Sequence, residues 1–334
     1  MRIQPARVYS GAGLPPEVRA LRPALTRPAD FFEFWTSTLA QLDREDPDVR
    51  SEPLEVSGDV ALSAVSFRSL GGVDIQGYSL IRTDDRPRPL VVHAHGYNSS
   101  SQVQRDWAES GCHVLGFDVR GFGDSMAAVP HASPHGWILT GVESPHAWVL
   151  RGAVCDYLRA VDVARPLVES TAGVISRVVA QGVSFAGGLA LLAEGHRPRA
   201  DMLAVGVPTF GWFAGRRSLR PGGSAAELND FLDRCSPDVE RLVMETVSYF
   251  DVVNSADLVR APVVVGVGCR DSIVPPETVY AVINHLRVAY ELWELPVSHS
   301  EAPEEALWTE FERRWLEIAL APEGRERPPA GPGV

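Results

Sequence analysis

Residues 178–192 read VVAQGVSFAGGLALL, and this stretch decides the fold class. Its valine-rich first half predicts a buried strand, and the small and apolar residues of its second half predict a helix. Gly182 and Ala186 flank Ser184 at the junction, where small residues let the strand and the helix approach closely. A serine on such a turn projects its hydroxyl above the sheet as a nucleophile. The alternative is that Ser184 only caps the helix, because short glycine motifs are weak signals.

Predicted strands and helices alternate on both sides of this stretch. The further apolar strands are LVVHAHG (90–96), CHVLGFDV (112–119), MLAVGVP (202–208), APVVVGVG (261–268) and YELWELP (290–296). Continuous apolar strands separated by helices indicate a mostly parallel central sheet with helices on both faces, in the α/β class. Before them, VALSAVSF (60–67) and VDIQGYSLIR (73–82) alternate in polarity, which predicts an antiparallel N-terminal hairpin.

The segments outside this alternation predict the domain organisation. Residues 1–29 are rich in proline and arginine and are expected to form an extended arm. Residues 30–321 are expected to form a single domain, in which an acid-rich loop precedes the hairpin. Residues 209–260 carry helical pieces without a strand signal and predict an insert that serves as a cap or an oligomer contact. The tail, 322–334, is expected to be disordered.

Composition excludes several function classes. The net charge is −12, which argues against nucleic acid or an anionic membrane as a partner. All 31 basic residues are arginine, so no mechanism that needs a catalytic lysine applies. The four cysteines form no C-x-x-C pair, so no zinc or redox motif is expected, and in a cytoplasmic protein they are not expected to form structural disulfides. Without an apolar run of signal-peptide or membrane-spanning length, the chain is predicted to be soluble and cytoplasmic.

Two further residues complete a candidate catalytic triad with Ser184. Asp271 follows the strand APVVVGVG, and His299 follows YELWELP, so the chain order is serine, acid, histidine. This order and these strand-end positions are typical of the α/β-hydrolase fold, which is the predicted fold. Asp271 would orient His299, and His299 would take the proton of Ser184. Glu277 is the alternative acid, but it lies within the next predicted helix.

The loop after the strand LVVHAHG supplies a candidate oxyanion hole. We expect the backbone N–H groups of Tyr97 and Phe185 to be its donors. His93 and His95 have the spacing of a metal pair, but alternate strand residues usually point into the core or a loop, and no metal site is predicted. Arg120 is expected to tie loops together through carboxylates, with substrate contact as the less favoured alternative.

Several of these motifs, taken in order, resemble one known family. They are HGYN (95–98), DVRGFGDS (118–125), RGAVCDYLRAVD (151–162), GVSFAGGLAL (182–191), the stretch from SYFDVVN (248–254) to DSIVPPETVYAVINHL (271–286), and SHSE (298–301). The sequence is similar over about residues 25–320 to the cephalosporin-C deacetylase and acetyl xylan esterase family, carbohydrate esterase family seven. The resemblance implies removal of acetyl or other short acyl groups from sugar or antibiotic alcohols, without a cofactor, by a homo-oligomer. It also implies the triad Ser184, Asp271 and His299.

Two departures from the family pattern bear on the substrate. The family usually carries glutamine where this chain has Phe122 and Phe185. With Tyr97 and Phe210, these residues are the predicted substrate contacts, and an apolar small-molecule ester is expected rather than polymeric xylan. Two alternatives stay open: an acyltransferase or lactone-forming enzyme that uses the same triad, and a non-catalytic scaffold.

Overall fold

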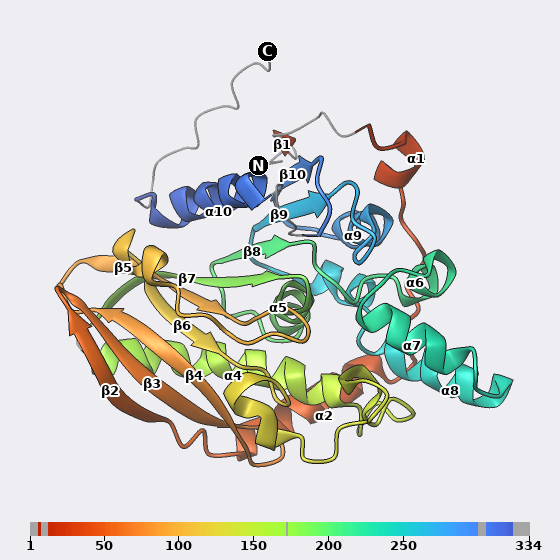
Figure 1. Cartoon of the computed structure of the whole chain (residues 1–334), viewed down its shortest axis with the longest axis horizontal. Helices are drawn as coiled ribbons and strands as arrows, with labels where there is room; N and C mark the ends of the chain where they lie inside the picture. Colours follow the sequence, from red (N-terminus) through yellow and green to blue (C-terminus); the bar gives the residue numbers. More distant parts are fainter. Residues whose placement is uncertain (1–5, 8–12, 172, 300–304, 323–334) are drawn as a thin grey trace.

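The strands form one continuous sheet. The computed structural model describes residues 6–7, 13–171, 173–299 and 305–322. Within these residues ten strands join in the order β1-β10-β9-β8-β7-β5-β6-β4-β3-β2. In this spatial order, all neighbouring strands from β1 through β10, β9, β8, β7 and β5 to β6 pair in parallel. The remaining pairs, β6 with β4, β4 with β3 and β3 with β2, are antiparallel. An antiparallel hairpin therefore extends a parallel sheet, as predicted (Figure 1).

The elements have the following bounds. The strands are β1 (Ala6–Arg7), β2 (Arg50–Ser57), β3 (Val60–Ser69), β4 (Val73–Arg82), β5 (Pro87–His93), β6 (His113–Phe117), β7 (Val174–Val183), β8 (Met202–Gly206), β9 (Val263–Gly268) and β10 (Tyr290–Leu295). The α-helices are α1 (Pro16–Arg19), α2 (Phe31–Arg44), α3 (Arg105–Glu109), α4 (Val149–Ser170), α5 (Phe185–His196), α6 (Phe213–Leu219), α7 (Ser224–Leu232), α8 (Pro237–Ser248), α9 (Pro276–Ile283) and α10 (Glu305–Leu320). The short 3₁₀ helices are η1 (Gly123–Ala128), η2 (Trp137–Leu139), η3 (Val252–Asn254) and η4 (Ala256–Leu258).

Helices cover both faces of the sheet, with α10 on one side and α4 with α2 on the other (Figure 1). Consecutive strand residues accordingly belong to different hydrophobic clusters. Val91 packs in the cluster that contains Trp107 of α3 and Trp315 of α10. Val92 belongs to the larger cluster under α4, where Tyr157 also donates a hydrogen bond to its carbonyl. The continuous apolar strands thus reflect burial on both faces.

The sequence pattern did not predict one of the strands. Residues 50–57, which the acid-rich composition predicts as loop, form the edge strand β2. All eight of its residues are exposed, so no buried face imposes an alternating pattern of polar and apolar side chains. Its pairing with β3 comes from the backbone alone, which is why the loop prediction is wrong here.

The segment 209–260 is helical where the structure describes it, with α6, α7 and α8 and then η3 and η4. The tail predicted as disordered lies, apart from Pro322, outside the described residues. The described helices include none whose length and apolar character would let it span a bilayer. The predicted cytoplasmic location and domain boundaries stay predictions.

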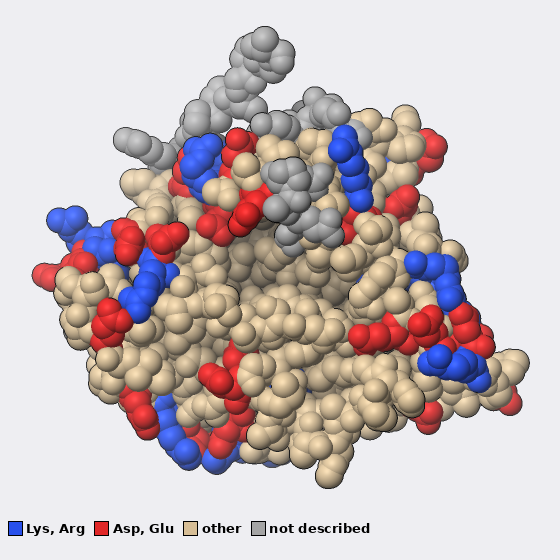
Figure 2. All heavy atoms as spheres, viewed as in Figure 1, with Lys and Arg blue, Asp and Glu red and all other residues tan. Residues whose placement is uncertain are grey.

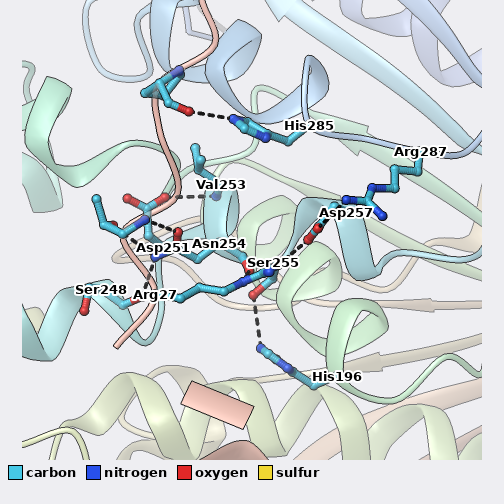
Figure 3. A network of polar contacts seen from close by, with 12 residues as sticks. Arg27, His196, Ser248, Asp251, Val253, Asn254, Ser255, Asp257, His285 and Arg287 are labelled. Carbon is cyan, nitrogen blue, oxygen red and sulfur yellow. Dashed lines mark hydrogen bonds and ion pairs between the residues drawn. The ribbon is translucent and has the colours of Figure 1, made fainter. Parts of the chain in front are cut away.

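The C-terminal end of the predicted arm makes hydrogen bonds and an ion pair with residues of η3 and η4 (Figure 3). Thr26 N donates to Asn254 Oδ1 at 2.8 Å, and Arg27 Nε donates to the Asn254 carbonyl at 2.7 Å. The Arg27 guanidinium also pairs with Asp257, a carboxylate that is almost fully buried. This region is therefore an integral part of the structure rather than a loose extension.

We expect Arg27→Ala to lower the free energy of unfolding by about 2 kcal/mol, the usual contribution of a hydrogen bond to a charged group. Of the ion pairs that Asp257 makes within the described part of the chain, the substitution leaves the longer one to Arg287, at 3.3 Å. Urea unfolding measures the change. Arg241→Ala is the matched control, because Arg241 is largely exposed and only 4.0 Å from Asp238. Equal effects of the two substitutions would contradict a structural role for the arm.

Candidate active site

Ser184 lies at the turn between β7 and α5 in a strained backbone conformation. Its φ is 56° and its ψ is −112°, at the N-cap position of α5. A residue with a Cβ atom rarely adopts such angles, which cost about 1–3 kcal/mol and persist where the surroundings hold them. The Ser184 amide donates to the Gly206 carbonyl at 2.8 Å, and its carbonyl accepts from Gly188 and Thr209 at 3.1 Å each. The turn is thus fixed on both sides, with the conformation of a nucleophile elbow.

Gly182 permits this turn because a side chain at its position would collide with the helix. A Cβ atom at Gly182 would lie 2.4 Å from the carbonyl carbon of Ala186. The first turn of α5 therefore packs directly on the end of β7, as the small residues around Ser184 predicted. The alanine at position 186, where a glycine is usual, does not prevent this approach.

We expect Gly182→Ala to destabilise the fold by about 1–3 kcal/mol, because the added methyl group overlaps backbone atoms that cannot move away cheaply. Thermal or urea unfolding measures the loss. Gly96→Ala is the control, since a Cβ atom there meets no atom within 4 Å. A Gly182→Ala protein as stable as Gly96→Ala would show that the turn tolerates a side chain.

Asp271 and His299 come together from the loops after β9 and β10. Asp271 Oδ1 accepts hydrogen bonds from the Ile273 and Val274 amides at 2.7 and 2.8 Å. Its Oδ2 lies 2.7 Å from His299 Nδ1. The Asp271 side chain is fully buried, whereas that of His299 is partly exposed. A carboxylate in this position accepts a hydrogen bond from Nδ1–H, so the lone pair of the neutral ring is on Nε2.

Two backbone amides near Ser184 are available as donors. The Tyr97 amide, in the loop after β5, donates to no acceptor within the described residues. The Phe185 amide opens α5, and the first amides of a helix have no partner inside it. Both are the groups that the sequence assigned to the oxyanion hole. Glu277, the alternative acid, lies in the first turn of α9, and it is Asp271 that holds His299.

Comparison with known proteins identifies the family. The family model for acetyl xylan esterase (AXE1) matches residues 14–312. The chain belongs to the acetyl xylan esterase family. It is therefore a carboxylic ester hydrolase with the α/β-hydrolase fold, which confirms the predicted fold and enzyme class.

Relatives of this acetyl xylan esterase family member cover nearly the whole chain. Acetyl esterase Axe7A of Xylanibacter ruminicola is 23% identical over 317 residues, which are 91% of this chain and 70% of the relative. The structure of an acetyl xylan esterase from Paenibacillus sp. R4 is 26% identical, with a TM-score of 0.79 over 90% of this chain and 99% of that one. Acetyl xylan esterase 1 from Thermoanaerobacterium sp. JW/SL YS485 shares the fold, with a TM-score of 0.79 at 22% identity, over 91% of this chain and 99% of that one.

The predicted substrate contacts form one aromatic cluster. The Phe185 ring lies 5.7 Å from each of the Tyr97, Phe122 and Phe210 rings, measured between centroids. Phe185 and Phe210 are fully buried, and Phe122 is nearly so, while Tyr97 is half-buried. The two phenylalanines that replace family glutamines thus pack against each other. Their rings are therefore buried in the protein rather than freely exposed.

Two residues of this cluster were not predicted. Trp137 of η2 packs on Phe122 and Phe185 at 5.0 and 5.4 Å. Glu227 of α7 accepts a hydrogen bond from the Tyr97 hydroxyl at 2.7 Å. Burial, followed by this carboxylate, raises the pKa of Tyr97 well above its usual value. Both residues come from distant segments, and neither has a motif around it that signals a contact with Tyr97.

The motif DVRGFGDS stabilises the loops beside the site. Arg120 pairs with Asp156 of α4 through Nε and Nη2 at 2.9 and 2.7 Å, and it also donates to the Leu70 carbonyl at 3.1 Å. Asp118 accepts hydrogen bonds from the Ser101 and Asp124 amides at 2.6 and 2.8 Å. Arg120 therefore ties loops together through a carboxylate, as predicted.

His93 and His95 use their ring nitrogens within the protein. His93 Nε2 lies 2.6 Å from the Tyr78 hydroxyl, and burial lowers the pKa of His93 to about 3. His95 Nδ1 lies 2.7 Å from the Gly96 carbonyl, and its Nε2 accepts from Val119 N at 3.0 Å. Both histidines therefore serve in hydrogen bonds at the end of β5, which accounts for their presence at alternate positions without a metal. No group of three or more metal-binding side chains occurs in the part of the chain that the structure describes.

Proposed function

We propose that Ser184, Asp271 and His299 are the catalytic triad of this esterase and that it removes acetyl groups from a small-molecule ester. The observation that carries the proposal is the strained backbone of Ser184 at the strand-to-helix turn. The hydrogen bond between Asp271 and His299 supports it, because it leaves Nε2 free to accept a proton.

The reaction follows from these positions. Ser184 Oγ attacks the acyl carbonyl carbon while His299 Nε2 takes the hydroxyl proton. The negative charge that develops on the carbonyl oxygen is stabilised by the Tyr97 and Phe185 amides, each worth about 3 kcal/mol in such sites. His299 then protonates the leaving alcohol, and an acyl-enzyme forms on Ser184. Water attacks this ester in the second half-reaction, with His299 as the base, and releases the carboxylic acid.

Covalent labelling tests the nucleophile directly. A fluorophosphonate probe is expected to add once per chain, and peptide mass spectrometry should locate the adduct on Ser184. Prior incubation with p-nitrophenyl acetate should slow the labelling by competition. An adduct on another residue would overturn the triad, and an unreactive protein would support a scaffold instead.

The aromatic cluster favours a short acyl group on an apolar or small alcohol. Phe185 and Phe210 are fully buried, so a long acyl chain cannot enter between them without displacing a ring. Overpacking of this kind costs about 1–3 kcal/mol, and each 1.4 kcal/mol corresponds to about a tenfold change in rate. We therefore expect kcat/KM to fall about tenfold or more from acetyl to hexanoyl p-nitrophenyl esters. A rise along this series would contradict a closed acyl pocket.

The same assay tests the alternative of an acyltransferase. With an alcohol added, the share of acyl groups that are transferred to the alcohol instead of to water measures acyl transfer.

The charge distribution fits a neutral small substrate. Figure 2 shows acidic and basic side chains around the outline of one face, whereas uncharged atoms fill its hollowed centre. This face presents no continuous basic surface of the kind that binds nucleic acid. The expectation of a small-molecule substrate without a nucleic-acid partner stays a prediction.

We propose a homo-oligomer as well. Edge strand β2 exposes Leu54 and Val56, whose exposed fractions are 64% and 71%. An exposed strand edge with apolar side chains is a ready surface for pairing between chains. Light scattering coupled to gel filtration measures the mass, and a monomer at micromolar concentration would contradict the proposal.

A further inference from the structure

A cavity whose described lining does not include Ser184 lies between the loop at 120–147 and the start of α4. Its volume is about 350 Å³. Arg120, Arg151, His131 and His146 line it, together with uncharged residues of the loop and of α4. No aspartate or glutamate occurs among its described lining residues. In a chain with a net charge of −12, this cavity is a local concentration of basic groups.

Arg151 is a buried cation that has no anionic partner among the residues that the structure describes. Its exposed fraction is 8%. Its three nitrogens donate to the Thr38 hydroxyl at 2.9 Å, the Gln41 side-chain oxygen at 2.8 Å and the His146 carbonyl at 3.3 Å, all of them neutral acceptors. Burial lowers the pKa of Arg151; the nearby Cys155 acts in the opposite direction, and Arg120 lowers the pKa further. The protein itself therefore does not neutralise this charge, which is costly for a buried cation.

Arg120 contributes an unused donor to the same cavity. Its Nε and Nη2 are engaged with Asp156 and neighbouring oxygens, whereas its Nη1 donates to no acceptor within the described residues. Gly152, which also lines the cavity, lies beside this atom, and a Cβ there would come within 2.1 Å of Nη1. Asp156 balances the charge of Arg120, so the charge of Arg151 is in excess.

We propose that this cavity binds a small anion, a carboxylate or a phosphate group. Such a group would accept hydrogen bonds from Arg120 Nη1 and from the second hydrogens of the Arg151 guanidinium. Charge-assisted hydrogen bonds from arginine to oxyanions are short and strong, and guanidinium geometry suits both kinds of oxyanion. His131 and His146 are exposed at the rim and would contact the rest of the ligand.

The site is independent of the proposed triad but adjacent to the aromatic cluster. The Arg120 carbonyl accepts a hydrogen bond from Trp137 Nε1 at 3.0 Å. The Trp137 ring also packs on Phe185, the residue after Ser184, with a centroid distance of 5.4 Å. Trp137 thus connects the backbone of Arg120 with the aromatic cluster. Binding of the anion can be measured whether or not the esterase proposal holds.

Isothermal titration calorimetry with inorganic phosphate, and separately with sodium acetate, tests the inference on the full chain at constant ionic strength. We expect saturable binding of at least one of the two anions, about tenfold weaker or more in Arg151→Gln. Ala147→Glu is a second variant, because Ala147 is exposed and lines the cavity, so the new carboxylate would compete with the anion. Arg105→Gln is the matched control, since Arg105 pairs with Glu55 at 2.7 Å outside the cavity.

Each outcome decides the inference. Preferential binding of phosphate or of acetate identifies the kind of oxyanion. Saturable binding that weakens in both cavity variants but not in Arg105→Gln supports the site. If Arg151→Gln does not fold, Ala147→Glu alone decides. Heats no larger than those of sodium chloride, or wild-type affinity in Ala147→Glu, would overturn the proposal.

Discussion

Ser184→Ala is expected to lower kcat for p-nitrophenyl acetate by about 10⁵-fold or more, the scale on which loss of a nucleophile acts when a triad works as a unit. Without the hydroxyl, no acyl-enzyme forms, and His299 has no proton to take from position 184. The remaining rate would come from oriented water and from the Tyr97 and Phe185 amides, the proposed oxyanion donors. Release of p-nitrophenol by protein free of wild-type contamination measures the loss of kcat. Fluorophosphonate labelling should disappear with it.

A second serine provides the control for this substitution. Ser79 is buried, and its hydroxyl has no hydrogen-bond partner within the described residues. Ser79→Ala therefore makes the same chemical change in a buried position without removing a contact, and activity and stability should stay close to wild type. If Ser184→Ala keeps more than a few per cent of the activity that Ser79→Ala keeps, another residue is the nucleophile.

The parts of the site that the sequence predicted share one physical basis. Parallel strands end at the same edge of a sheet, so residues that follow β5, β7, β9 and β10 converge there. The order of Ser184, Asp271 and His299 along the chain, and the small residues around Ser184, were therefore sufficient to place candidates. The contact of 2.7 Å between Asp271 and His299 could not be read from the sequence, because loop conformation decides it.

The contacts made by the helical segment could not be predicted for a different reason. Glu227 reaches Tyr97 from α7, more than a hundred residues along the chain, and the packing of α6, α7 and α8 decides that approach. The sequence also gave no indication that the Phe185 side chain is fully buried. The substrate contact expected of Phe185 stays a prediction, and the structure adds that its ring packs among the aromatic side chains of Tyr97, Phe122, Trp137 and Phe210.

Asp271→Asn should lower kcat by about 10⁴-fold while the fold survives, since loss of the orienting carboxylate has effects of this size. Asp271 Oδ1 is held by the Ile273 and Val274 amides, and an amide oxygen can accept the same two hydrogen bonds. The new side-chain nitrogen then takes the place of Oδ2 beside His299 Nδ1. It donates rather than accepts, so the histidine proton moves to Nε2, and the ring can no longer take the proton of Ser184.

The readouts separate this tautomer effect from a structural one. KM for p-nitrophenyl acetate should change little, because the substitution leaves the predicted substrate contacts untouched. The unfolding midpoint should stay near that of wild type. Glu277→Gln is the matched control, since it makes the same change at the alternative acid in the first turn of α9. A large loss of kcat in Glu277→Gln with a small one in Asp271→Asn would reassign the acid. A loss in Asp271→Asn that follows stability instead of the chemical step would show that Asp271 acts mainly by capping its loop.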